Sequence, residues 1–216
     1  YLKALSGATL IAQGTENDSI YFMPSDINAS TSTSGLHFAD NSIGTSTSND
    51  TSYVSGSIID YCVFMNFTGA GPVKSYAFLL VSNSKFINNQ TTTGAMEAKK
   101  GLVSYKNYFY DNSSSNNPLY GGGGGAINIF IHIDDPSYYS GYGDPSLIHS
   151  SLFINNSAPQ GGAINAHGYS LNFISIVNSK FSDNSAADGG ACCFNGGGSG
   201  SYRNVEIIGC YFDNNT

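Results

Sequence analysis

The sequence predicts an all-β protein, folded as a right-handed, single-stranded parallel β-helix with three short strands in each of about seven coils. Two recurring motifs and their spacing carry this prediction. The first motif is Phe-x-Asx-Asn followed by Ser, Thr or Gln, and the second is Gly-Gly-Ala followed by Ile or Cys. Successive phenylalanines of the first motif are 22 to 44 residues apart. A self-similar unit of about this length is typical of a solenoid.

The first motif predicts one inward-facing strand in every coil. A small residue stands two positions before most of the phenylalanines, and a mostly β-branched residue stands five before, which suits strands with one buried face. The copy at Phe64 is degenerate because Phe67 replaces its asparagine. We expect the motif phenylalanines to form one interior stack, made of Phe38, Phe64, Phe86, Phe109, Phe153, Phe181 and Phe212.

The polar half of the first motif predicts a bend and a ladder. Asp and Asn tolerate left-handed backbone and hydrogen-bond their own main chain, so Asx-Asn indicates a tight turn. Stacked at one point of every coil, the fourth-position amides can hydrogen-bond from rung to rung. The expected ladder is Asn41, Asn89, Asn112, Asn156, Asn184 and Asn215. The Gly-Gly pairs predict a second bend that glycine makes easily.

The chain reads as one β-helix domain over residues 1–216. Residues 1–37 are expected to form an irregular first coil or a cap, and residues 38–216 hold the repeats. Residues 95–100 have helical propensity but occupy the position of a repeat strand, so we expect a strand there. Insertions at 113–125 and 134–146 interrupt the repeat, and loops of one kind emerge together at one edge of a solenoid.

The sequence stops at Thr216, directly after a regular motif copy. Independent solenoids close their ends with atypical capping units, and open strand edges attract further strands. We therefore expect a segment of a larger protein. Its partners would lie end to end, as further repeats of the parent chain or as neighbouring subunits.

The pairing of GGA[ILV] with FxxN resembles the repeat of the polymorphic outer membrane proteins of the chlamydial type. The resemblance extends from Phe38 to Thr216 and is poor before Phe38. It implies a secreted or cell-surface β-helix, a passenger or stalk that is often adhesive. It supplies no catalytic residues. On this basis we expect a structural or adhesive protein, with surface glycans or host proteins as further partners.

Composition excludes several other classes. A net charge of −7 makes nucleic acid an unsuitable partner. A hydrophobic content of 40%, with 13 Phe and 15 Tyr, argues against disorder. Apolar runs all fall well short of the ~20 residues that a membrane-spanning helix needs. We expect no cofactor and no membrane span in this segment.

A carbohydrate-active enzyme, a polysaccharide lyase or hydrolase on a β-helix scaffold, is the alternative function. Such an enzyme needs carboxylates that face one groove. The local acidic cluster is Asp134, Asp135 and Asp144, all in one insertion, with His132 and His149 at its two ends. Capping of the loop explains these residues more simply, and turn chemistry explains the Asx column better than a calcium ladder. We therefore expect no catalytic residues and no metal.

The same insertion carries the candidate binding residues Tyr138, Tyr139 and Tyr142. Tyrosine rings can stack on sugar rings while their hydroxyls hydrogen-bond. Packing of these rings on the flank of the solenoid is the other interpretation, and the sequence leaves both open.

Asn-x-Ser/Thr sequons supply candidate glycosylation sites. Asn89 and Asn112 are expected to be inaccessible because they belong to the ladder. The six remaining candidates lie in loops or at the bend, and they are Asn17, Asn28, Asn49, Asn66, Asn155 and Asn214.

The four cysteines are Cys62, Cys192, Cys193 and Cys210. Two alternatives stay open at this point: buried free thiols that act as small hydrophobes, or one disulfide that joins Cys210 to Cys192 or Cys193. Cys62 shares a column with Cys210 but lies several coils away, too far for a bond. We expect Cys62 to be free.

Overall fold

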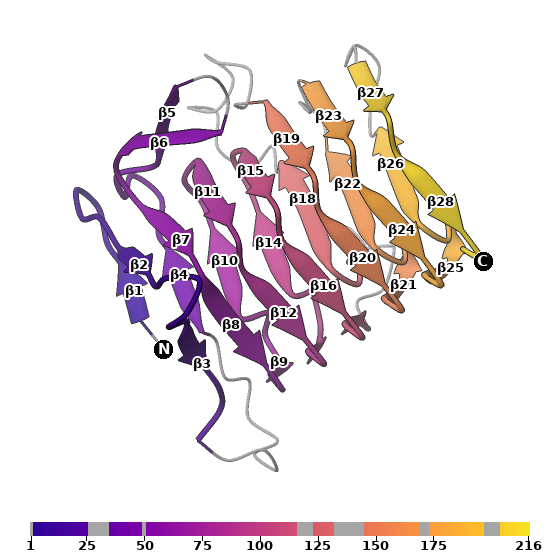
Figure 1. The fold of residues 1–216 in the computed structure, drawn as a ribbon, viewed down its shortest axis with the longest axis horizontal. Helices are drawn as coiled ribbons and strands as arrows, with labels where there is room; N and C mark the ends of the chain where they lie inside the picture. Colours follow the sequence, from indigo (N-terminus) through magenta and orange to yellow (C-terminus); the bar gives the residue numbers. More distant parts are fainter. Residues whose placement is uncertain are drawn as a thin grey trace.

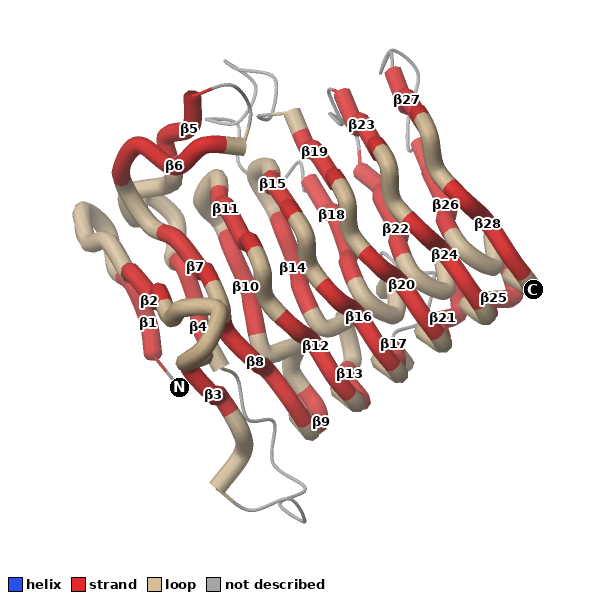
Figure 2. Tube along the Cα trace, in the orientation of Figure 1, coloured by secondary structure: helices blue, strands red, loops and turns tan. Residues whose placement is uncertain are grey.

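The computed structural model describes residues 2–25, 35–48, 51–115, 123–131, 145–168, 173–196 and 204–216. Within these residues the regular structure is entirely β (Figure 2). The strands wind into a stack of coils that runs from the N-terminal to the C-terminal end of the molecule (Figure 1). The expected all-β parallel β-helix is therefore confirmed.

Three long parallel sheets of seven strands each build the stack. The first sheet has the order β1 (Leu2–Ala4), β4 (Leu36–Phe38), β10 (Val73–Ser75), β14 (Met96–Ala98), β18 (Ile127–Ile131), β22 (Ile164–Gly168) and β26 (Cys192–Gly196). The second has the order β2 (Ile11–Gln13), β7 (Ile58–Asp60), β11 (Leu79–Ser82), β15 (Leu102–Tyr105), β19 (Ser146–His149), β23 (Phe173–Val177) and β27 (Asn204–Ile208). The third has the order β3 (Ile20–Phe22), β8 (Cys62–Met65), β12 (Lys85–Ile87), β16 (Tyr108–Tyr110), β20 (Leu152–Ile154), β24 (Lys180–Ser182) and β28 (Tyr211–Asp213).

A fourth, shorter sheet follows the bend after the third sheet. Its order is β9 (Thr68–Gly69), β13 (Gln90–Thr91), β17 (Ser113–Ser114), β21 (Ser157–Gln160) and β25 (Ser185–Asp188). One antiparallel hairpin, β5 (Ser46–Ser48) with β6 (Ser52–Ser55), interrupts the second coil between the first and second sheets. Its Tyr53 packs on a small outer cluster of Ile58, Leu80 and Val103. The hairpin thus covers apolar side chains on the outer face of the second sheet.

The phenylalanine column is the centre of the core. Phe64, Phe86, Phe109, Phe153 and Phe181 are 0% exposed. Consecutive rings from Phe64 to Phe212 are stacked nearly parallel, with centroids 4.7 to 4.9 Å apart. One ring per coil repeats the spacing between parallel strands, so each ring fills the space above the previous one.

The assignment of Phe38 to this stack, and of Asn41 to the ladder, is wrong. Phe38 is buried, but it lies in β4 of the first sheet, where it pairs with Ala4 and Ser75. Phe22 takes its place, with its ring 4.8 Å from that of Phe64. The segment FADNS still forms a bend, with Asn41 at φ 59° and Ser42 N donating to Ala39 O. The motif therefore specified a local turn but not the sheet in which that turn lies.

Two columns of left-handed residues bracket the third sheet. The column after the strand contains Asn66, Asn88, Asp111, Asn155, Asp183 and Asn214, with φ between 49° and 63°. The column before the strand contains Tyr61, Asn83, Lys106, Ser150, Asn178 and Gly209, with φ between 47° and 61°. Most residues are asparagine, aspartate or glycine, which tolerate this conformation best. The two bends set the length of the phenylalanine strand in each coil.

An amide ladder runs beside the phenylalanine stack. The side-chain amide of Asn89 donates to Oδ1 of Asn112 at 2.8 Å, and Asn112 donates to Asn156 at 2.9 Å. The series continues through Asn184 to Asn215. Each Nδ2 also donates to the phenylalanine carbonyl one coil back, as Asn156 does to Phe109 at 3.1 Å. All amides therefore point the same way along the axis.

A second polar ladder, which the sequence analysis did not predict, occupies the small column two residues before phenylalanine. Backbone N–H groups donate to the side chain one coil further on: Cys62 to Ser84, Ser84 to Asn107, Asn107 to Ser151, Ser151 to Ser179, and Ser179 to the sulfur of Cys210. The side chain of Ser151 in turn donates to His149 O. The small residues are therefore hydrogen-bonding rungs, which explains why Asn107 also fits this column.

Candidate functional site

The outer face of the first sheet carries a cluster of ionisable and aromatic side chains. Strands of this sheet alternate, so that Val73 and Ser75 face inward while Lys74 lies between them. We call the cluster the outer seam, and it consists of His37, Lys74, Tyr76, Glu97, Lys99, Asn128, Phe130, Asn165 and His167.

Glu97 lies at the centre of the outer seam. Its neighbours across the strands are Lys74 in β10 and Asn128 in β18. Lys74 Nζ lies 3.4 Å from Oε2 of Glu97, and Lys99 Nζ lies 3.2 Å from Oε1. Glu97 is only 5% exposed. A buried carboxylate is costly unless it is paired, and two ammonium groups meet this requirement.

Aromatic rings extend the outer seam along the axis. Lys99 Nζ lies 4.8 Å from the centroid of Tyr76 and 5.3 Å from that of Phe130. The Phe130 ring stacks on His167 at 4.3 Å. Ring faces attract cations, so the lysine is held between two aromatic side chains as well as by Glu97. The side chains of the outer seam therefore contact one another through ring stacking, cation–π contacts and ion pairs.

The electrostatics of the outer seam favour fixed charges over proton transfer. Burial lowers the pKa of Lys74, but the Glu97 carboxylate and Tyr76 outweigh it, so that the pKa is raised and the ammonium persists at neutral pH. Burial, with Lys3 and Lys74 next in importance, lowers the pKa of His37, so its imidazole is neutral at pH 7. A lysine with a raised pKa is a poor general base.

Sequence reasoning missed the outer seam, although a signal for it exists. Successive coils repeat one pair of positions: the residue directly after the first inward apolar residue, and the residue two positions after that. The pairs are Lys74 and Tyr76, Glu97 and Lys99, Asn128 and Phe130, and Asn165 and His167. Each pair has the period of two of a strand's outer face. Aligning coils on the Gly-Gly-Ala motif brings these pairs into register, as the strand pairing shows.

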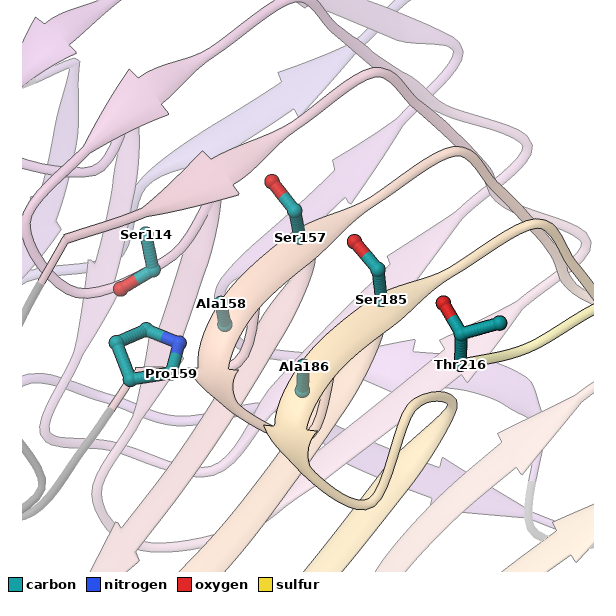
Figure 3. Close-up of a pocket in the computed structure, with 7 residues that line it drawn as sticks. All are labelled: Ser114, Ser157, Ala158, Pro159, Ser185, Ala186 and Thr216. Atoms are coloured by element: carbon teal, nitrogen blue, oxygen red, sulfur yellow. The ribbon is translucent and has the colours of Figure 1, made fainter.

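An open depression of about 470 Å³ lies on the fourth sheet (Figure 3). Its lining is Ser114, Ser157, Ala158, Pro159, Ser185, Ala186 and Thr216. Figure 3 shows the hydroxyls of Ser157, Ser185 and Thr216 side by side on successive coils. This lining offers hydroxyls and small apolar groups but no ionisable side chain, so it can hydrogen-bond a ligand without supplying an acid or a base.

Most of the predicted insertion residues lie outside the described residues. These are Tyr138, Tyr139 and Tyr142, together with His132, Asp134, Asp135 and Asp144. His149 is described, and its Nδ1 lies 2.8 Å from the hydroxyl of Ser150. Within the part of the chain that the structure describes, no group of three or more His, Cys, Asp or Glu is placed to hold a metal ion.

The structure describes four of the six candidate glycosylation sites. Asn17, Asn155 and Asn214 are exposed, and Asn66 is half-buried. Asn28 and Asn49 lie outside the described residues. Asn66, Asn155 and Asn214 occupy the left-handed bend, and Asn155 Nδ2 donates to Asp111 Oδ1. Glycosylation of these sites stays a prediction.

All four cysteines are free in the structure. No disulfide joins Cys210 to Cys192 or Cys193 in the structure, and the Cys210 sulfur accepts from Ser179 N and donates to Ile176 O. Burial raises the pKa of Cys62 to about 11, and it also raises the pKa of Cys192 and of Cys193. Thiols with raised pKa values react slowly. The structure therefore has four free thiols, of which Cys62 is buried and Cys192, Cys193 and Cys210 are half-buried.

The described residues include no helix of the length and apolar character that would cross a membrane.

Comparison with known proteins identifies one repeat. A model of the Chlamydia polymorphic membrane protein repeat matches residues 150–167. This segment holds Phe153 of the stack, Asn156 of the ladder and the Gly-Gly pair at 161–162. The chain therefore carries a repeat of the chlamydial polymorphic membrane protein type. Neither the curated proteins nor the solved structures contain a match to this chain.

Proposed function

We propose that this chain is the β-helical rod of a surface protein, and that it has a structural or adhesive function. The chlamydial polymorphic membrane protein-type repeat at 150–167 supports a surface protein. The chain is accordingly secreted or displayed at the cell surface. One observation carries the structural part of the proposal, namely the unbroken column of stacked rings from Phe22 to Phe212.

A rod of this kind resists bending because every coil contacts its neighbours through the same groups. The ring stack, the amide ladder and three parallel sheets all run along one axis. Most buried polar groups on this axis are paired within the protein, as buried groups must be for a stable core. Such a scaffold holds its connecting loops at constant positions, which favours display of a binding surface.

The adhesive part of the proposal concerns the edge between the first and second sheets. All strands of these sheets are parallel, so the connections from one to the other leave along the same edge. The β5–β6 hairpin is an insertion of this kind (Figure 1). The sequence between β18 and β19 contains Tyr138, Tyr139 and Tyr142, which lie outside the described residues. Tyrosines suit contacts with sugars or with a protein surface.

Binding to surface glycans and to host cells tests this proposal. Replacing Tyr138, Tyr139 and Tyr142 together by alanine is expected to abolish retention on a glycan array or on cultured cells while leaving the melting temperature unchanged. A matched control replaces the exposed flank residues Tyr21, Tyr110 and Tyr211 by alanine and should still bind. Equal binding by the two triple variants, or no binding by the unaltered chain, contradicts the adhesive role.

The carbohydrate-active enzyme is not proposed further. The matched repeat is not that of an enzyme family. The acid at the centre of the outer seam, Glu97, is paired with two lysines rather than with a second carboxylate. Glycoside hydrolysis requires two carboxyl groups on opposite sides of the bond.

A further inference from the structure

We propose that the outer seam forms a covalent cross-link, an amide bond between Nζ of Lys99 and the side-chain carbonyl carbon of Asn128. Ammonia leaves Asn128 in this reaction, and Glu97 carries the protons. Lys99 directly follows β14 and Asn128 lies in β18, two strands that lie side by side in adjacent coils (Figure 1). The proposal does not depend on the adhesive function, because it concerns the covalent structure of the chain itself.

The strand register brings the three reacting residues together. Glu97 in β14 pairs directly with Asn128 in β18, and Lys99 lies two residues after Glu97 on the same outer face. Lys99 Nζ lies 3.2 Å from Oε1 of Glu97 and 5.3 Å from the ring centroid of Phe130. The amine therefore contacts one residue on each strand. Asn128 is the strand partner of the first of these residues and lies two positions before the second.

The surroundings of these groups favour the transfer of a proton from the ammonium to the carboxylate. Glu97 and Asn128 are only 5% and 3% exposed. The rings of Tyr76 and Phe130 flank Lys99 Nζ, with centroids 4.8 and 5.3 Å away. Charged groups are costly away from water, so an ion pair in such a place is closer in free energy to the neutral amine and acid than it is in solution.

The carbonyl group of Asn128 is prepared for attack by its neighbour in the next coil. Asn165 in β22 pairs with Asn128, and its Nδ2 donates to Oδ1 of Asn128 at 3.4 Å. Asn165 is 0% exposed, so water does not compete for this hydrogen bond. A donor at this oxygen stabilises the negative charge that develops when a nucleophile adds to the carbonyl carbon. Asn128 thus has a proton carrier on one neighbouring strand and an oxyanion donor on the other.

The reaction begins when the ammonium group of Lys99 gives one proton to Glu97 along their 3.2 Å contact. The neutral Nζ then attacks Cγ of Asn128, and the electron pair of the carbonyl bond moves to Oδ1. Glu97 gives its proton to Nδ2 of Asn128 and takes another from Nζ. The carbonyl bond forms again as the bond from Cγ to Nδ2 breaks. Ammonia leaves and takes the proton from Glu97, so the carboxylate is restored and no further reactant is needed.

Lys74, the second cation of the outer seam, is not the nucleophile. It lies in β10, on the opposite side of β14 from β18. The Glu97 carboxylate and Tyr76 raise its pKa against the effect of burial, so it keeps its proton. Lys74 therefore stays charged beside Glu97 while Lys99 reacts. The reaction takes place once in each molecule, so a small fraction of neutral Lys99 amine is sufficient.

Mass spectrometry of the complete, folded chain tests the proposal. The unaltered protein should be lighter than its sequence by one molecule of ammonia, and a proteolytic digest should contain one branched peptide that links Lys99 to Asn128. Lys99→Arg keeps the positive charge beside Glu97 but replaces the amine with a guanidinium that does not lose its proton, so this variant should have its full mass. Lys74→Arg is the matched control and should still lose ammonia. Asn128→Ala and Glu97→Gln should have their full masses.

Circular dichroism establishes which variants are folded. If Glu97→Gln or Asn128→Ala does not fold, the two arginine variants decide the question, because both retain every charge of the outer seam. A succinimide at Asn195-Gly196 would also release ammonia, but it would not link two peptides. Full mass for the unaltered folded chain would overturn the proposal. Ammonia loss that persists in Lys99→Arg, or that maps to a peptide without a branch, would also overturn it.

Discussion

Gly162 packs closely against the backbone of Ser185 in the next coil, with no room for a side chain at position 162. A Cβ on Gly162 would lie 2.1 Å from Gly190 O, 2.6 Å from Ser185 N and 2.7 Å from Ser185 O, closer than real contacts allow. Gly125 stands in the same relation to Ser157, and Gly190 to Thr216. The second glycine of each Gly-Gly pair thus packs on the residue that follows the ladder asparagine of the next coil. These contacts join the Gly-Gly bend of one coil to the bend after phenylalanine in the next coil.

Replacing Gly162 by alanine should therefore destabilise the protein by about 3 kcal/mol, because the added methyl meets backbone that cannot move aside. Urea unfolding measures the change. Gly7→Ala is the control, since a Cβ at Gly7 meets nothing within 4 Å. That variant bears only the left-handed backbone cost of about 1 kcal/mol. Equal losses for the two variants would show that the close contacts of position 162 with Gly190 and Ser185 are unimportant.

The amide ladder predicts a large effect for Asn156→Ala. Oδ1 of Asn156 accepts from both the backbone and the side-chain amide of Asn112. Removing it leaves buried donors unpaired, at about 1–3 kcal/mol each. We expect a loss of roughly 2–5 kcal/mol in thermal unfolding, on the same basis. The exposed neighbour Asn155, changed to alanine, should cost much less, and a similar loss for both would contradict the ladder's role.

Two adjacent serines should respond to glycine in opposite directions. Ser150 is held at φ 51°, so Ser150→Gly removes backbone strain and should stabilise the protein by about 0.5–1 kcal/mol. Ser151 is 0% exposed and accepts from Asn107 N, so Ser151→Gly removes a rung. That variant should lose about 1–3 kcal/mol. Chemical denaturation of both variants measures the sign of each change in the free energy of unfolding. Equal losses of stability in the two variants would contradict this explanation of the bend.

Cysteine ionisation predicts a loss of stability in alkaline solution. The thiol of Cys62 has an ordinary pKa of 9.0 when unfolded, and burial raises its pKa to about 11 in the fold. Because the folded pKa is the higher one, the contribution to stability is complete below pH 9 and is lost as the pH rises towards 11. Cys62→Ala should reduce this pH dependence. An unchanged slope of unfolding free energy against pH in that variant would contradict it.

The period, the bends and most of the ring stack follow from the order of residues along the chain. Phe64 to Phe212 and Asn89 to Asn215 could be placed because each coil repeats the same strand, the same left-handed turn and the same contact with its neighbour. These features depend on a few consecutive residues and on identical residues one coil away. A pattern in the chain therefore contains the information that positions them.

Which turn belongs to which sheet depends on the pairing of strands from different coils. FADNS at Phe38 and IYFMPS at Phe22 show this, because the first carries the motif yet lies in the first sheet, while the second lacks the motif yet completes the stack. Strand pairing selected Phe22, since β3 aligns with β8 and leaves Phe38 to fill a column of small residues such as Ala4 and Ser75.

The outer seam and the free thiols were decided in the same way. Glu97 meets Lys74 and Lys99 only because β10 and β14 lie side by side, and Cys210 joins the second ladder only because Ser179 lies one coil away. Such contacts depend on which outward or inward side chains the coil lengths bring into register. Coil lengths vary with the insertions. Local sequence patterns therefore specify the strands and turns of each coil, whereas the pairing between coils specifies which side chains contact one another.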